Sequence, residues 1–252
     1  FAKQFTYQYT PITARAHFDY LYHDSWFDFI PDLSIPFLPF QYLKIRNCDV
    51  VHTISQHGYD HLCDKFSGLK SKVKVSRLGV KDNLESENQN EIENRDTFTI
   101  VTCSWITENK RLYKVPQIIA GLEHSVTWVH LGSGAGEDLA KLKAEIAKYG
   151  IENRVEILGK LQHKEIIQFY RETKVDLIMN LSFVEGIPVS LMEAACFGIP
   201  MLATETIGNP EIVNEDNGIL IPVDFDESLV ISKINAYFYN KKEMENDKKK
   251  KE

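Results

Sequence analysis

The sequence lacks the features that mark a membrane-spanning or a disulfide-rich protein. No apolar run reaches the roughly 18 residues that cross a bilayer, and no signal-peptide pattern opens the chain. Four cysteines are present, but no two stand at the C-x-x-C spacing of a zinc ribbon, and they suggest no disulfide framework. These absences favour the reducing cytoplasm. The chain begins at Phe1 as if inside a domain, so we expect a piece of a longer protein.

An excess of positive charge is also missing. The chain carries 29 Lys and Arg against 36 Asp and Glu, a formal net charge of −7. This balance argues against a general nucleic-acid binder, because such proteins carry a basic stripe. The last segment, 241–252 (KKEMENDKKKKE), is rich in lysine but has no apolar face. We therefore expect a solvated or frayed end, with peripheral contact to an anionic membrane surface as the alternative.

From residue 97 the sequence alternates between short apolar runs and helix-like stretches. The runs predict strands at Phe98–Cys103, Thr127–Leu131, Val155–Leu158, Val175–Leu181, Pro200–Ala203 and Gly218–Ile221. The stretches predict helices at Leu112–Leu122, Glu137–Tyr149, Lys164–Glu172 and Val189–Phe197. This alternation is typical of right-handed βαβ units, and continuous apolar runs fit strands that are buried on both faces. We predict an α/β fold with a doubly wound, Rossmann-like parallel sheet over residues 97–235 and a charged tail over 236–252.

The first 80 residues predict the closing part of another α/β domain. Strands are expected at Ile12–His17, Asp49–Ile54 and Lys72–Ser76, a helix over Gln56–Phe66, and an irregular aromatic loop over Tyr20–Phe40. The polar stretch 81–96 (KDNLESENQNEIENRD) separates the two apolar regions. It predicts a linker between the domains or a long surface loop.

Residues that follow the apolar runs are the candidates for a binding site, because ligands of open parallel sheets bind beyond the carboxyl ends of the strands. Glycines, charged residues and hydroxyl groups gather in these positions, which predicts a site for a polar, anionic ligand. The segments are Ser104–Arg111, Leu131–Gly136, Gly159–Leu161, Ser182–Pro188 and Thr204–Glu211.

The loop from Glu185 to Pro188 is the most informative of these segments. Gly186 permits a close backbone approach, and Pro188 suits the first position of a helix that Gly198 would end. Free N–H groups at the start of such a helix suit a diphosphate. Glu193 could then accept both hydroxyls of a ribose, while Glu185 could accept the hydroxyls of a sugar. Taken alone, the two glutamates fit a loop acid and a helix-surface acid equally well.

The string from Glu185 to Pro200 (EGIPVSLMEAACFGIP) resembles the Glu-x7-Glu signature of glycosyltransferase family 4. Members of that family are retaining enzymes with the two-domain GT-B architecture. Further segments match in order over residues 45–225. They are Cys48–Val51 with Ser55, Lys110, Gly132–Gly134, Val155–Gly159 with Tyr170, Gly208–Val213 and Asn217–Leu220. The resemblance implies a GT-B protein whose N-terminal domain is incomplete in this chain.

The resemblance also implies an activity. Family members transfer a sugar from a nucleotide diphosphate donor, by default a UDP-sugar, and need no bound metal or other cofactor. The acceptor would be a saccharide, a lipid-linked saccharide or a protein in surface polysaccharide or glycan synthesis. Lys110 would hold the diphosphate, Glu193 the ribose and Glu185 the donor hexose. The implied donor-binding residues are Lys110, Arg111, Gly132, Gly134, Lys160, Leu161, Glu185, Gly186, Ile187, Pro188, Val189 and Glu193, and the implied catalytic residues are Glu185, Lys110 and His17.

The sequence departs from the family in two places. Trp105 stands where many relatives carry an arginine, so Arg111 becomes the candidate for a second cation. The glycine-rich loop that opens the first domain is missing, and His17 is almost as well explained as a structural histidine. Because one wall of the inter-domain cleft would be incomplete, we expect this chain alone to bind nucleotide but to transfer little or no sugar.

Two other functions stay open. A catalytically silent subunit that binds the nucleotide-sugar and stabilises a true transferase would keep the same pocket. A sugar-nucleotide epimerase of the same architecture would need acid–base residues around the sugar, and beyond Glu185 no convincing set is present. A dinucleotide oxidoreductase is disfavoured, because Gly132–Gly136 lacks the full G-x-G-x-x-G spacing at the first strand of its domain.

Overall fold

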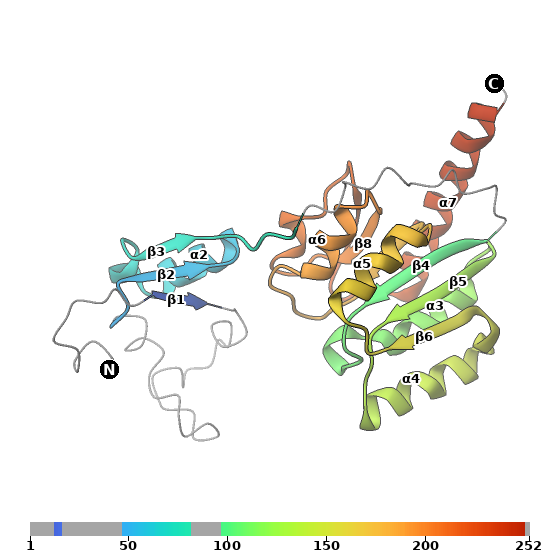
Figure 1. Cartoon of the computed structure of the whole chain (residues 1–252), viewed down its shortest axis with the longest axis horizontal. Coiled ribbons are helices and arrows are strands. Elements are labelled where there is room, and N and C mark those ends of the chain that lie inside the picture. Colours follow the sequence, from blue (N-terminus) through green and yellow to red (C-terminus); the bar gives the residue numbers. More distant parts are fainter. Residues whose placement is uncertain (1–12, 17–46, 82–96, 250–252) are drawn as a thin grey trace. The chain divides into compact units, whose positions relative to one another are not determined.

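The computed structural model describes residues 13–16, 47–81 and 97–249 (Figure 1). The chain divides into two compact units, Phe1–Gly79 and Val80–Glu252. Three sequence predictions lie outside the described residues: the role of His17, the irregular loop over Tyr20–Phe40, and, beyond Lys81, the linker.

The first unit contains a small parallel sheet. Its strands β1 (Thr13–Ala16), β2 (Val50–Thr53) and β3 (Val73–Val75) pair in the order β1-β2-β3. Helix α2 (Gln56–Lys65) begins after Ser55, whose Oγ accepts the Gly58 N–H at 3.0 Å, and the short 3-10 helix η3 (Ser67–Leu69) follows. Apolar side chains from these elements form a small core of their own: Cys48, Val51, Leu62, Cys63, Leu69 and Val73.

The second unit is built on a six-stranded parallel sheet. The strands are β4 (Phe98–Cys103), β5 (Val126–Leu131), β6 (Val155–Gly159), β7 (Leu177–Asn180), β8 (Met201–Thr204) and β9 (Gly218–Ile221). Their order is β6-β5-β4-β7-β8-β9, so the chain builds outward from β4 on one side and then returns to β4 to build outward on the other. This order confirms the predicted doubly wound, Rossmann-like fold. It also creates a switch point between β4 and β7, where such sheets bind ligands.

Helices connect the strands on both faces of this sheet. They are the 3-10 helices η4 (Glu108–Lys110), η5 (Leu112–Lys114), η6 (Glu152–Arg154) and η7 (Asn209–Glu211), and the α-helices α3 (Val115–Gly121), α4 (Gly136–Tyr149), α5 (His163–Glu172), α6 (Val189–Ala195) and α7 (Glu227–Lys249). Helix α4 shows how the sequence sets these bounds. It has Glu137 and Asp138 in its first turn, next to the positive end of the helix dipole, and ends at Gly150 in the left-handed conformation, with φ 62°.

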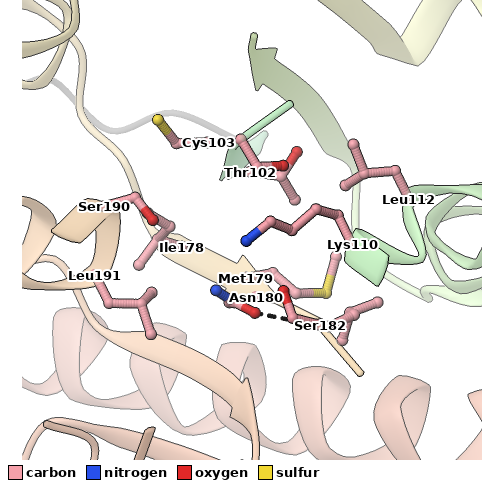
Figure 2. A pocket seen from close by; sticks show the side chains of 12 residues that line it. Thr102, Cys103, Lys110, Leu112, Ile178, Met179, Asn180, Ser182, Ser190 and Leu191 are labelled. Carbon is pink, nitrogen blue, oxygen red and sulfur yellow. Dashed lines mark hydrogen bonds between the residues drawn. The ribbon is translucent and has the colours of Figure 1, made fainter. Parts of the chain in front are cut away.

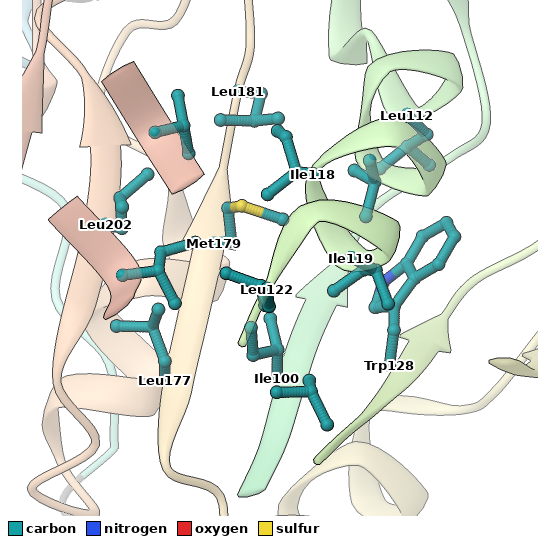
Figure 3. Close-up of a cluster of buried hydrophobic side chains, with 14 of the residues drawn as sticks. Ile100, Leu112, Ile118, Ile119, Leu122, Trp128, Leu177, Met179, Leu181 and Leu202 are labelled. Atoms are coloured by element: carbon teal, nitrogen blue, oxygen red, sulfur yellow. The ribbon is translucent and has the colours of Figure 1, made fainter. Parts of the chain in front are cut away.

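Each face of the sheet carries its own apolar core, because successive strand residues point to opposite faces. In β4, Ile100 packs into one core and Val101 into the other. The larger core contains Trp128 and joins the sheet to α3, α4 and α7 (Figure 3). The second core joins it to α5 and α6 through Tyr170 and Leu191. Both faces are therefore covered, as the continuous apolar runs predict.

The charged tail predicted over 236–252 begins too early, because helix α7 (Glu227–Lys249) continues through it. Residue 236 lies inside α7, and Phe238 beyond it is fully buried and stacks on Phe98 with ring centroids 4.0 Å apart. Lys241 is not simply solvated either, since its Nζ lies 2.7 Å from Oδ1 of the buried Asp176. Apolar residues at helical spacing extend the domain past the point where charge begins to dominate the sequence. Within the described part of the chain, no helix is both long and apolar enough to cross a membrane.

Candidate functional site

A small pocket opens at the carboxyl ends of β4 and β7, the switch point of the sheet (Figure 2). It is lined by Thr102, Cys103, Ser104, Lys110, Leu112, Ile178, Met179, Asn180, Leu181, Ser182, Ser190 and Leu191. The lining comes from two strands, from the loops that follow them, and from the first turn of α6. Polar side chains thus meet where the strand-end rule places a ligand.

Lys110 and Glu185 form a close ion pair at this pocket, although 75 positions separate them in the sequence. Oε1 of Glu185 also accepts hydrogen bonds from Asn180 Nδ2 at 3.2 Å and from Ser182 Oγ at 2.6 Å. Glu185 is only 8% exposed, so the simple interpretation as a solvated loop acid is wrong. Three donors on one oxygen satisfy this buried carboxylate and fix its position in the pocket.

Asn109 holds the two loops that carry this pair. Its backbone carbonyl accepts the Phe183 N–H at 2.8 Å. Its side chain bonds both polar groups of Val184, donating to the carbonyl and accepting from the N–H, each at 3.0 Å. These three hydrogen bonds join the loop after β4 to the loop after β7 and so hold Lys110 and Glu185 close to each other.

Arg111 does not have the role that the sequence predicts. Its Nε, Nη1 and Nη2 donate to the backbone carbonyls of Leu181 (2.6 Å), Val223 (2.7 Å) and Ser182 (3.1 Å). The guanidinium also lies 4.8 Å from the ring centroid of Phe225 and is buried, which lowers its pKa by desolvation. All three nitrogens are thus occupied by backbone carbonyls, two in the loop after β7 and one in the segment after β9. Arg111 therefore fixes backbone and does not act as a second cation facing the ligand.

Gly132 and Gly134 allow two loops to cross. Gly132 has φ +150°, and a methyl group on it would overlap the carbonyl of Ser104. A methyl group on Gly134 would overlap Ile106. The crossing is sealed by hydrogen bonds from Ser104 N to Leu131 O (3.1 Å) and from Ile106 N to Ser133 O (2.9 Å). Because Ser104 lines the pocket, these glycines shape the site through the loop beside it.

The Glu185–Pro188 loop leads into α6 with a small difference from the prediction. Pro188 is the residue before the helix, and α6 starts at Val189 and ends at Ala195, two residues early. Gly198 lies beyond that end in the left-handed conformation, with φ +66°. Gly186, Ile187 and Pro188 are buried, whereas the side chain of Val189 is exposed.

Glu193 lies inside α6 and is 6% exposed, so it is not a helix-surface acid. Its Oε1 is 2.7 Å from Nε2 of His163, the first residue of α5. Cys103 and Tyr170 lie close enough to interact electrostatically with Glu193, but both are neutral. Burial raises the pKa of the Cys103 thiol to about 11, and burial likewise raises the pKa of Tyr170. Cys103 is therefore no nucleophile near neutral pH.

Lys160 and Leu161 lie in the connection from β6 to α5 and are not part of the lining at β4 and β7. Lys160 is exposed and Leu161 half-buried. An antiparallel bridge between Gly132 and Gly159 joins this connection to the glycine loop. The two residues thus belong to the same edge of the sheet as the pocket, but they follow β6, which is two strands away from β4.

A buried polar chain lies beneath the pocket. Thr102 Oγ1 accepts from Trp128 Nε1 at 2.9 Å and lies 2.8 Å from Nδ1 of His130. A hydroxyl has one donor and two acceptor sites, so it can bond both rings at once. Burial lowers the pKa of His130 to about 4, so the ring is neutral at neutral pH. It supports Thr102, a residue of the pocket lining.

Two residues of this site were missed from the sequence. Asn180 is the last residue of β7 and lies inside the predicted run Val175–Leu181, so the strand-end rule did not include it, whereas Ser182 opens one of the candidate segments. His163 is the second, because it lies outside every candidate segment; Asn109 lies inside one, but its bonds to the loop after β7 carry no sequence signal. Their partners are more than 25 positions away, and only the folded chain brings them together.

Residues 83–252 match the family described as Glycosyl transferases group 1. The amylovoran biosynthesis glycosyltransferase AmsD of Erwinia amylovora is 27% identical over 178 residues, covering 70% of this chain and 49% of the relative. The phosphatidylinositol N-acetylglucosaminyltransferase gpi3 subunit of Schizosaccharomyces pombe is 29% identical over 183 residues, covering 68% and 38%. The chain thus spans at most about half the length of these relatives.

Solved structures share the fold. Anabaena Alr3699/HepE, in complex with UDP and glucose, superimposes with a TM-score of 0.70 at 22% identity over 79% of this chain and 56% of that one. The lipopolysaccharide outer core galactosyltransferase WaaB, in its apo form, gives a TM-score of 0.63 at 18% identity over 77% and 54%. At such identities the likeness concerns the fold alone. The family match covers well over half of the chain, and the chain therefore belongs to the group 1 glycosyl transferases.

Proposed function

We propose that the protein is a retaining glycosyltransferase of family 4 that transfers a hexose from a nucleotide diphosphate sugar to a saccharide, lipid-linked or protein acceptor in glycan synthesis. The observation that carries this proposal is the ion pair of half-buried Lys110 and buried Glu185 at the pocket between β4 and β7. The two groups suit the two ends of such a donor. The ammonium can hold the diphosphate as negative charge develops on it, and the carboxylate can accept the hydroxyls of the sugar.

The proposed donor is a UDP-sugar, since the Anabaena protein of the same fold has been crystallised with UDP and with UDP-glucose. Glu193 would hold the ribose, the connection through Lys160 and Leu161 would meet the base, and the backbone of 186–189 would meet sugar and phosphate. Lys110 and backbone N–H groups would take the charge of the leaving diphosphate, so the proposal invokes no bound metal. His17, outside the described residues, remains a proposed neighbour of the donor sugar.

A nucleotide-sugar-binding subunit is the second candidate. It is favoured by the similarity to the gpi3 subunit of Schizosaccharomyces pombe, whose name describes it as part of an N-acetylglucosaminyltransferase. Such a subunit would bind the donor through the same buried carboxylates but transfer no sugar. A peripheral position at a membrane, with a lipid-linked acceptor, would suit either candidate.

Thermal unfolding with a panel of donors tests the proposal. At 100 times its dissociation constant, a ligand stabilises the folded state by about 2.7 kcal/mol, which corresponds to a rise in Tm of roughly 5 to 10 °C for a unit of this size. We expect UDP-sugars to give this rise and GDP- and ADP-sugars to give little. The Glu193→Ala variant should lose most of the rise, because its ribose partner is gone. No response to any nucleotide-sugar would contradict both candidates.

A further inference from the structure

His163 occupies a fixed position at the start of α5. The helix begins with a capping box, in which Gln162 and Glu165 bond each other's backbone, and the Gln162 N–H donates to Glu165 Oε2 at 2.6 Å. His163 is the first residue inside this cap and directly follows the connection through Lys160 and Leu161. Its side chain is 67% exposed, yet Nε2 reaches Oε1 of Glu193 on α6 at 2.7 Å. The imidazole thus links two elements of the sheet edge.

Glu193 has acceptor capacity that this contact does not use. A carboxylate accepts about four hydrogen bonds. Among the residues that the structure describes, His163 is the one seen to donate to Glu193. Its nearby ionisable neighbours Cys103 and Tyr170 are neutral, and the Lys110 ammonium is paired with Glu185. A carboxylate buried to this degree is costly unless donors meet it, and a ligand with adjacent hydroxyl groups would supply such donors.

We propose that His163 is a positioning residue that selects for the ribose of the donor. By donating its Nε2–H to Oε1, it holds the Glu193 carboxylate in one orientation, so that the other oxygen can accept the vicinal 2′- and 3′-hydroxyls of the nucleotide. A pair whose two side chains are both exposed would contribute little to holding either of them in place. Here one partner is buried, and its orientation is set by the exposed imidazole. This inference rests on the proposed function, because it assigns Glu193 to a nucleotide.

Calorimetry with UDP and with 2′,3′-dideoxy-UDP tests this role. His163→Ala should weaken UDP binding by about 10- to 100-fold, the effect of losing one hydrogen bond to a charged group. The same variant should leave the affinity for 2′,3′-dideoxy-UDP unchanged, since that ligand lacks the hydroxyls. His163→Gln keeps an N–H donor at a similar reach and should restore most of the UDP affinity. In a Glu193→Ala background, His163→Ala should cause no further loss. Lys164→Ala, at the next and exposed position of α5, is the matched control and should bind as the parent does.

The outcomes separate the inference from the proposed function. If the parent binds UDP and His163→Ala binds it equally well, the inference is wrong while the proposed function stands. An equal loss of affinity for UDP and for the dideoxy analogue would assign His163 a merely structural role, which also overturns the inference. Failure of the parent to bind UDP at all would overturn both.

Discussion

The Glu185→Gln variant is expected to lose about 100-fold or more in sugar transfer by the full-length protein while still binding UDP. Glutamine has the same shape, but it removes the negative charge that Lys110, Asn180 and Ser182 surround. Without a charged acceptor, the hydroxyls of the donor sugar lose their strongest partner. UDP alone should bind as tightly as before, or more tightly, because the variant removes a negative charge beside the diphosphate.

Calorimetry can follow this change without knowledge of the acceptor. We expect the parent to bind the UDP-sugar more tightly than UDP, and the variant to lose that difference. Glu227→Gln is the matched control: Glu227 also pairs with a lysine, Lys114, at 2.5 Å, but neither residue belongs to the pocket lining. Loss of UDP binding in Glu185→Gln, with the sugar increment preserved, would show that we have assigned the carboxylate to the wrong end of the donor.

Gly208→Ala is expected to destabilise the second unit by about 3 kcal/mol and to abolish nucleotide binding. Gly208 is buried against the loop before α6, and a methyl group on it would overlap the backbone carbonyl of Gly186. Backbone cannot rotate away as a flexible side chain can, so the Glu185–Pro188 loop would have to move. That loop carries Glu185 and sets the start of α6. Urea unfolding and UDP calorimetry on the same variant measure the two effects.

Gly198→Ala controls for the general cost of replacing a glycine. Gly198 has φ +66°, but a methyl group there would meet no atom within 4 Å. We expect this variant to lose about 1 to 2 kcal/mol from backbone strain alone and to bind UDP normally. Equal effects of the two substitutions on UDP binding would mean that contact between the 186 and 208 loops does not position the site.

The sheet was predictable from the sequence because its signal is local. All six strands of the second unit coincide with apolar runs in the sequence. The runs at Phe98–Cys103 and Gly218–Ile221 match the strand bounds. The bounds of α6 were less predictable, since Pro188 is compatible both with the first helical turn and with the position before it. The end of the domain was misjudged for a similar reason. Lysines dominate the composition beyond residue 240, and the packing of Phe238 on Phe98 is a long-range contact.

The site was predictable only to the level of its loops. The strand-end rule brings Lys110 and Glu185 to one edge, but it says nothing about where a side chain is aimed. Arg111 illustrates the limit: from the sequence it is a cation beside the ligand, whereas in the structure its nitrogens bond three backbone carbonyls. Arg111 also has a left-handed backbone, with φ 49°. No spacing in the sequence indicates such a conformation.

A crystal structure of the chain soaked with UDP tests the central claim most directly. We expect the diphosphate within hydrogen-bonding distance of Lys110 Nζ, at the pocket between β4 and β7, and the ribose hydroxyls on the carboxylate of Glu193. Such a complex would place the donor at the switch point of the sheet, beside the Lys110–Glu185 pair. Density for UDP at any other edge of the sheet, or at the pocket but with the ribose away from Glu193, would contradict this account.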